Sequence, residues 1–98
     1  MTLYDICTEI AEVEEGLAYG EIKFTFDNLM SAMKPGHPAD ILDDILSVIG
    51  WDIQSGITPE REKLEQTLKD LTIFKESFKV KELSKPIKHL KEYLDETK

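Results

Sequence analysis

The chain has one cysteine, Cys7, in 98 residues, so an internal disulfide is excluded. A lone cysteine is typical of proteins kept in a reducing compartment, and we predict a cytoplasmic location. No apolar stretch has the roughly 20 residues that a membrane-spanning helix requires, and no basic-then-apolar leader is present, so no membrane association is expected. Cys7 lies among Leu3, Ile6 and Ile10, which favours a buried structural thiol over a reactive one.

Motifs for catalysis and cofactor binding are scarce. The two histidines, His37 and His89, lie far apart in the sequence, and no cysteine or histidine stands at a spacing that binds zinc. The chain has no Glu-x-x-His pair for a bundle-core iron site and no glycine-rich phosphate loop. Neither histidine has an evident serine or cysteine to activate, so we predict that both are surface residues. We therefore predict a protein with no catalytic residues, no cofactor and no metal.

Basic residues are scarce in the first half of the chain. Residues 1–50 contain ten acidic residues and two lysines, a net charge of −8, whereas residues 51–98 contain ten of each sign and are neutral. An acidic first half repels nucleic acid and anionic lipid and attracts basic surfaces. Direct binding of nucleic acid is therefore disfavoured, but binding to the basic groove of a nucleic-acid enzyme is not.

The most apolar stretch runs from Pro38 to Trp51. Pro38 suits the first position of a helix, and Gly50 suits a left-handed helix end, so we predict a helix over residues 38–49. Trp51 is then expected to fold back onto Leu46. The apolar arc of this helix is wide enough to touch two neighbours, which predicts the central helix of a bundle. It comprises Ile41, Leu42, Ile45, Leu46, Val48 and Ile49.

Helical periodicity also marks both ends of the chain. A first helix is predicted over Leu3–Ala18, with Thr2 as its cap and Asp5 completing a capping box. A last helix is predicted to begin near Ser84, just before Pro86. Each end carries an apolar seam with spacing 3-4-3-4, namely Leu3, Ile6, Ile10, Val13 and Leu17, and then Val80, Leu83, Ile87, Leu90 and Leu94.

Between these segments, Thr58-Pro59-Glu60 predicts another helix start, with Thr58 as the cap and Pro59 as the first residue. Its apolar stripe comprises Leu64, Leu68, Leu71, Phe74 and Phe78. Phe24 and Ile73 lie outside the apolar faces of their own segments, so we expect both to be exposed.

The segment Glu21–Lys34 fits both a short strand and a helix. Since no partner strand is evident, we favour a helix that begins at Thr25 or earlier. Together these segments predict one all-α domain over residues 1–98, a small bundle of four to five short helices with a single-layer core.

Two acidic pairs suggest one specific chemistry. Glu12-x-x-Glu15 and Asp40-x-x-Asp43 resemble the Glu-x-x-Glu and Glu-x-x-Asp pattern of MazG-like nucleotide pyrophosphohydrolases, which are all-α. The resemblance covers four residues and departs from the family pattern at Asp40, where the family has Glu. It implies that these carboxylates bind magnesium, which engages the phosphates of the substrate. A helix turns about 100° per residue, and on that basis both pairs point away from the apolar stripes. Such positions are typical of a solvent-exposed helix face.

The function predicted from these features is a small acidic, non-catalytic protein-binding module. It would act as an inhibitor or adaptor by covering a partner's basic surface, as antitoxins, immunity proteins and viral or mobile-element inhibitors do. One alternative is the magnesium-dependent hydrolase, and another is a structural module, possible as a homodimer, in which the two seams pair between chains. The lysines from Lys81 to Lys91 are expected to form a solvated face. The predicted partner-binding residues are Glu9, Glu12, Glu15, Asp40, Asp43, Asp44 and Trp51.

Overall fold

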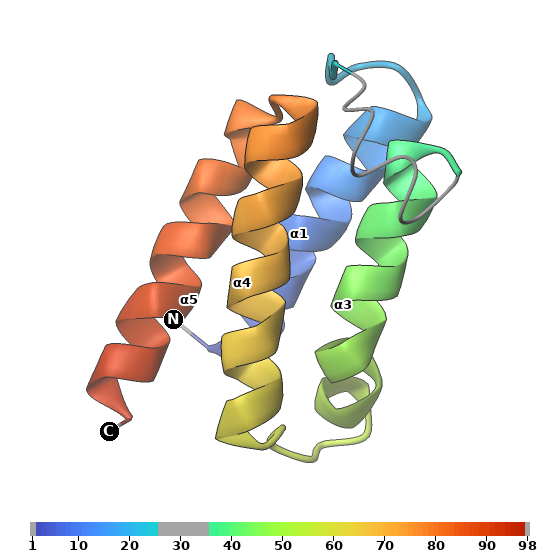
Figure 1. Cartoon of the computed structure of the whole chain (residues 1–98). Coiled ribbons are helices and arrows are strands. Elements are labelled where there is room, and N and C mark those ends of the chain that lie inside the picture. The colour runs from blue at the N-terminus through green and yellow to red at the C-terminus, as the bar shows by residue number, and fades with distance from the viewer. Residues whose placement is uncertain (1, 26–35, 98) are drawn as a thin grey trace.

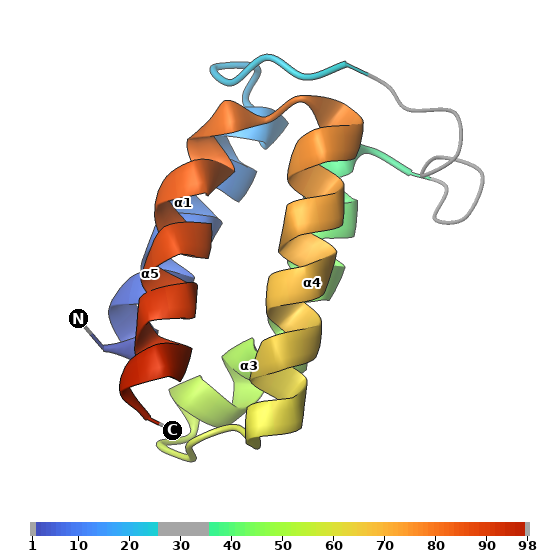
Figure 2. The ribbon, with the colours of Figure 1, turned by 60° about the vertical axis from the view of Figure 1, so that its left-hand side comes forward.

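The computed structural model describes residues 2–25 and 36–97, which form a bundle of four α-helices. Each helix runs antiparallel to the next, and the fourth packs back against the first, which closes a ring (Figures 1 and 2). The all-α bundle predicted from the sequence is confirmed. None of its helices, within the described ranges, is long and apolar enough to cross a membrane. The helices are α1 (Leu3–Ala18), α3 (Pro38–Gln54), α4 (Arg61–Phe78) and α5 (Ser84–Glu96), with a short 3₁₀ helix, η1 (Lys81–Leu83), before α5.

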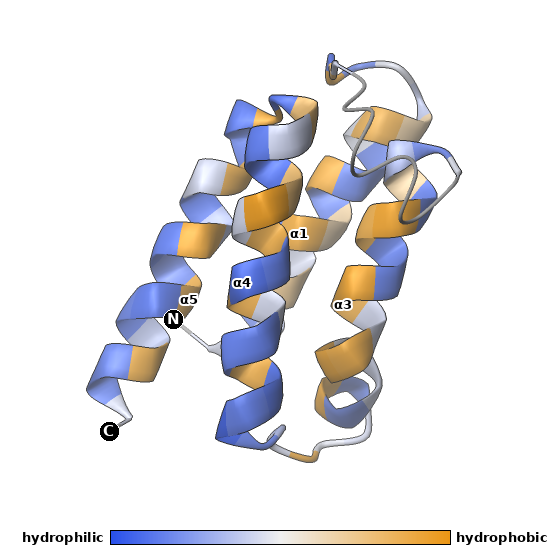
Figure 3. Cartoon of the chain, viewed as in Figure 1, coloured by the Kyte–Doolittle hydropathy of each residue, from blue (hydrophilic) through white to orange (hydrophobic). Residues whose placement is uncertain are grey.

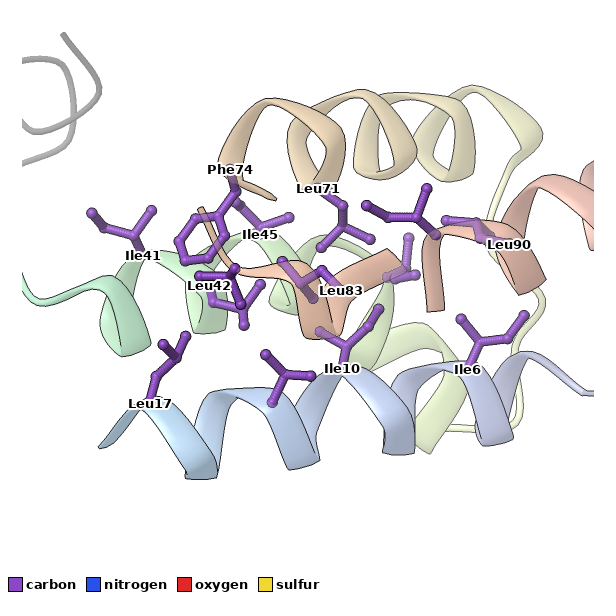
Figure 4. Close-up of a cluster of buried hydrophobic side chains, with 14 of the residues drawn as sticks. Ile6, Ile10, Leu17, Ile41, Leu42, Ile45, Leu71, Phe74, Leu83 and Leu90 are labelled. Carbon is purple, nitrogen blue, oxygen red and sulfur yellow. The ribbon is translucent and has the colours of Figure 1, made fainter. Parts of the chain in front are cut away.

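The core lies along the axis of this ring. Hydrophobic positions recur at regular intervals along the helices, with hydrophilic positions between them (Figure 3). Side chains from α1, α3, α4, η1 and α5 point toward one another inside the ring (Figure 4). Both 3-4 seams predicted from the sequence are buried in this core, so the chain uses them internally. The largest fully buried side chains include Phe74, Phe78, Ile10, Leu42 and Leu90.

The first helix begins as its sequence predicts. The Thr2 hydroxyl accepts a hydrogen bond from the Asp5 backbone N–H at 3.2 Å, and the Asp5 carboxylate accepts one from the Thr2 N–H at 3.2 Å. The Thr2 N–H and the Thr2 hydroxyl both donate to the Asp5 carboxylate and stabilise its ionised form, which lowers the pKa of Asp5. Cys7 is partly buried on the inner side of α1, and burial raises the pKa of its thiol to about 11, as expected for an unreactive thiol.

The predicted end of α3 is wrong. The helix continues through Gly50 to Gln54, and the left-handed residue that follows it is Gly56, with φ of 77°. Ile53 packs against the core in the added turn, and such packing outweighs the low helix propensity of one glycine. Trp51 consequently lies on the outer side, 71% exposed. The helix also forms one side of the ring, between α1 and α4, and is not its centre.

The start of α4 also differs from the prediction, whereas α5 begins where expected. The helix α4 begins at Arg61, after a buried Pro59, and its cap residue Glu60 makes no side-chain hydrogen bond. Ser84 is the first residue of α5 and not its cap. Pro86 then falls in the first turn, where a backbone N–H has no helical acceptor and its loss is tolerated.

The described part of segment 21–34 is not helical. Residues 21–25 form a loop in which the Thr25 N–H donates to the Phe78 carbonyl at 2.8 Å. Ile22 lies over Gly16 of α1, where a Cβ would come within 2.5 Å of its Cδ1. Phe24 is partly buried, not exposed, with its ring edge-on to His37 at 5.4 Å. The rest of the predicted helix, residues 26–34, lies outside the described residues.

Candidate protein-binding face

Charge is segregated between the two halves of the ring. The helices α1 and α3 contain five and four acidic residues and no lysine, arginine or histidine, while α4 and α5 supply all the basic residues of the bundle's helices. In the ring, α1 lies between α3 and α5, and α3 lies between α1 and α4. Among the four α-helices, the basic neighbours of α1 are therefore on the α5 side, and those of α3 are on the α4 side.

On the α5 side of α1, this acidity is neutralised. One oxygen of the Glu9 carboxylate lies 2.7 Å from Nδ1 of His89, and the other lies 3.3 Å from Nζ of Lys85. The Glu9 side chain is only 14% exposed and that of His89 only 21% exposed. The prediction that both residues lie on the outer surface is therefore wrong, because Glu9 sits at the boundary where α5 packs. Asp52 of α3 is paired in the same way with Lys63 of α4, at 3.5 Å.

Where α1 meets α3, carboxyl groups face one another. Glu14 of α1 is partly buried and its side chain hydrogen-bonds that of Asp43 on α3. The pKa of Glu14 is raised to about 7, from an ordinary 4.5, chiefly by burial and in addition by the negative charges of Asp43, Asp40 and Glu15. Among the described residues, no ion pair joins any of these four carboxyls to a basic side chain. Within the described part of the chain, no ion pair therefore neutralises the negative charge at this junction.

Glu14 was not among the candidate residues predicted from the sequence. A helical wheel places it about 40° from Ile10, one turn earlier, and so at the edge of the apolar stripe. That position is the signal that would have identified it, since an acid at a stripe edge lies beside a neighbouring helix. The predicted residue Glu12 instead lines a hollow of about 210 Å³ between α1 and α5, together with Lys85 and Pro86.

The four-residue pattern that resembles the hydrolases is thus only partly gathered. Asp40, Asp43 and Glu15 surround Glu14, whereas Glu12 lies toward α5. No group of three or more potential ligands with metal-binding geometry occurs in residues 2–25 and 36–97. We define the acidic face as the carboxyl groups of Glu14, Glu15, Asp40, Asp43 and Asp44.

Next to the acidic face, α3 has a shallow hollow on its outer side. Its volume is about 190 Å³, below the roughly 300 Å³ at which small-molecule sites begin, so it suits a single side chain. The Ser47 hydroxyl donates to the Asp43 carbonyl at 2.7 Å, which holds that hydroxyl against its own helix. We call this feature the α3 hollow, and it is lined by Asp43, Leu46, Ser47, Gly50, Trp51 and Gln54.

A larger hollow, of about 410 Å³, lies at the end of the bundle where α1 begins and α5 ends. Its lining combines exposed Tyr4 and Ile57 with Ile53 and Tyr93, and none of its lining residues is acidic or basic. It therefore offers mainly apolar contact, and its lining has no charged side chain to hold an ion.

Comparison with known proteins adds no further assignment. No family model matches the chain, and neither the curated proteins nor the solved structures include a significant match.

Proposed function

We propose that this protein is a non-catalytic binding module whose acidic face covers a basic surface of a partner protein, so that it acts as an inhibitor or adaptor. The observation that carries the proposal is the junction of α1 and α3, where Glu14 meets Asp43 without any basic residue on either helix. Burial is the main cause of the raised pKa of Glu14, and the negative charges of Asp43, Asp40 and Glu15 add to it, so this junction is a site of negative potential. A cationic partner would relieve that potential.

The placement of Trp51 supports the same face. Trp51 is 71% exposed and Val48 is 44% exposed, and both lie on α3 beside Asp44. Interfaces that bind tightly combine an aromatic anchor with a charged surround, because the anchor supplies buried area and the charges steer the encounter. The outer side of α3 carries both components.

The test compares two charge reversals of equal size. Replacing Asp40, Asp43 and Asp44 with lysine changes the net charge by +6 on the acidic face, from −8 to −2. We expect this variant to associate with a partner, purified after capture from the source cells at low salt, at least about tenfold more slowly than the parent. Stopped-flow measurement at several salt concentrations checks this, and the parent rate should fall as salt rises.

The matched control applies the same change elsewhere. Replacing Glu62, Glu76 and Glu92 with lysine also gives a net charge of −2, but on exposed positions of α4 and α5. Its association rate should stay within about twofold of the parent. Equal slowing in both variants would mean that only the total charge matters, and the acidic face would lose its assignment.

A further inference from the structure

The α3 hollow contains a large aromatic side chain that the fold leaves uncovered. Trp51 is the only tryptophan of the chain, and it stands on the outer side of α3, away from the core. Tryptophan is the residue most often found as an energetic anchor in protein interfaces, and its ring face attracts cations. An exposed ring that borders a hollow is thus available to a side chain from another protein.

The floor of this hollow includes a glycine that the fold does not require. Gly50 lies within α3, where glycine is among the least favourable residues. A Cβ at this position would meet only the Leu46 Cγ, at 3.8 Å, an ordinary contact. Gly16 of α1 differs, because Ile22 occupies the space of its missing side chain. Packing within the fold therefore requires a glycine at position 16. At position 50, the absence of a side chain only enlarges the α3 hollow.

The charge of the hollow identifies what fits it. Asp43 lies at one end of the hollow, and its side chain is hydrogen-bonded to that of Glu14. Among the described residues no ion pair joins Asp43 to a basic side chain, so this carboxylate can accept a complementary group from another protein. Arginine suits such a site better than lysine, because its planar guanidinium stacks on an aromatic ring and pairs with a carboxylate through two hydrogen bonds.

We propose that the α3 hollow seats one arginine side chain of the partner protein, with its guanidinium stacked on Trp51 and paired with Asp43. This inference rests on the proposed function and deepens it, since it names the residue type that the acidic face selects. Electrostatic attraction alone does not distinguish arginine from lysine. The hollow adds that discrimination through the ring of Trp51 and the space above Gly50.

The test uses two labelled peptides of equal charge, one of six arginines and one of six lysines, with fluorescence anisotropy at low salt. We expect the arginine peptide to bind about fivefold more tightly than the lysine peptide. Trp51→Leu removes the ring and Gly50→Ala narrows the hollow, and each should weaken binding of the arginine peptide more than that of the lysine peptide, so that the affinity ratio comes close to one. The fluorescence of the single tryptophan should respond to the arginine peptide in the parent protein.

The control is Val48→Ala, an exposed α3 position outside the hollow, which should keep the arginine preference. Equal affinity for both peptides in the parent protein, or a preference that survives both Trp51→Leu and Gly50→Ala, would overturn the arginine seat and leave the acidic face intact. Binding of neither peptide would overturn both proposals. Circular dichroism confirms that each variant is folded.

Discussion

The two sides of α1 differ in whether their acidic residues are paired with basic residues. On the α5 side, Glu9 is held by His89 and Lys85, and Gly16 is covered by Ile22. On the α3 side, Glu14 faces only other carboxyls, and across the junction Gly50 opens into a hollow. Each side thus has a carboxylate and a helical glycine, and only one side satisfies them within the chain. The contacts on the α5 side stabilise the fold, and the α3 side is the one that we propose binds a partner.

The largest expected effect comes from removing the carboxylate on the satisfied side. Glu9→Ala should lower the free energy of unfolding by about 2 kcal/mol, because a hydrogen bond between ionisable groups is lost and His89 keeps a partly buried nitrogen without its partner. Urea unfolding at pH 6 measures this. Glu12→Ala, on an exposed position of the same helix, should stay within about 0.5 kcal/mol of the parent. Equal losses would show that the Glu9 contacts contribute nothing specific.

The two glycines should respond with opposite signs to the same substitution. Gly16→Ala places a methyl group 2.5 Å from the Ile22 Cδ1, and displacing that side chain should destabilise the protein by about 1 to 2 kcal/mol, despite the better helix propensity of alanine. Gly50→Ala meets no such contact and should stabilise it by about 0.5 to 1 kcal/mol. Thermal unfolding of both variants gives the comparison. A change of the same sign in the unfolding temperature of both variants would show that the two glycines do not differ in this way.

The smallest effect concerns the pH dependence of stability through Glu14. The folded protein keeps a proton on this carboxyl up to about pH 7, whereas the unfolded chain releases it near pH 4.5. The stabilisation from this raised pKa is therefore complete below pH 4.5 and is lost as the pH rises to 7. Glu14→Gln should be more stable than the parent by about 1 kcal/mol at pH 8, a value reduced for solvent screening at this partly exposed site, and the difference should vanish near pH 4.5.

Chemical denaturation at steps from pH 4.5 to 8 measures that difference. Glu62→Gln, at an exposed acidic position of α4, serves as the control and should follow the parent at every pH. A difference in the free energy of unfolding between Glu14→Gln and the parent that stays constant over the whole pH range would contradict the linkage to a proton on Glu14.

Local features of the sequence predicted the parts of the fold that depend on local interactions. The capping box of Thr2 and Asp5 and the apolar seams follow from short-range hydrogen bonding and helical periodicity, and the structure has them as predicted. Helix ends were less predictable. Gly50 does not end α3, because Ile53 gains core contacts in the next turn, and packing between helices outweighs the local signal.

The helical wheel alone could not predict which carboxylates are paired with basic residues and which are not. Glu9 and Glu14 both lie at the edges of one apolar stripe, and only the order of helices in the ring decides which edge meets a basic neighbour. Glu9 was predicted to face outward, and Glu14 was not identified as a candidate. Both errors arose because the helical wheel treats α1 as an isolated helix. The exposure of Asp40, Asp43 and Asp44 agrees with the prediction, whereas their role in binding stays a prediction.

The ring also has a consequence for the order in which the chain can fold. Its closing contact joins the first helix to the last, and the pair of Glu9 and His89 spans 80 positions of sequence. During synthesis, α1 and α3 emerge early as two acidic helices whose charges repel, and the basic groups that pair with Glu9 of α1 are added only with the 13-residue helix α5. A ribosome-bound chain that lacks α5 therefore leaves an open apolar flank, and the bundle closes only when α5 has emerged.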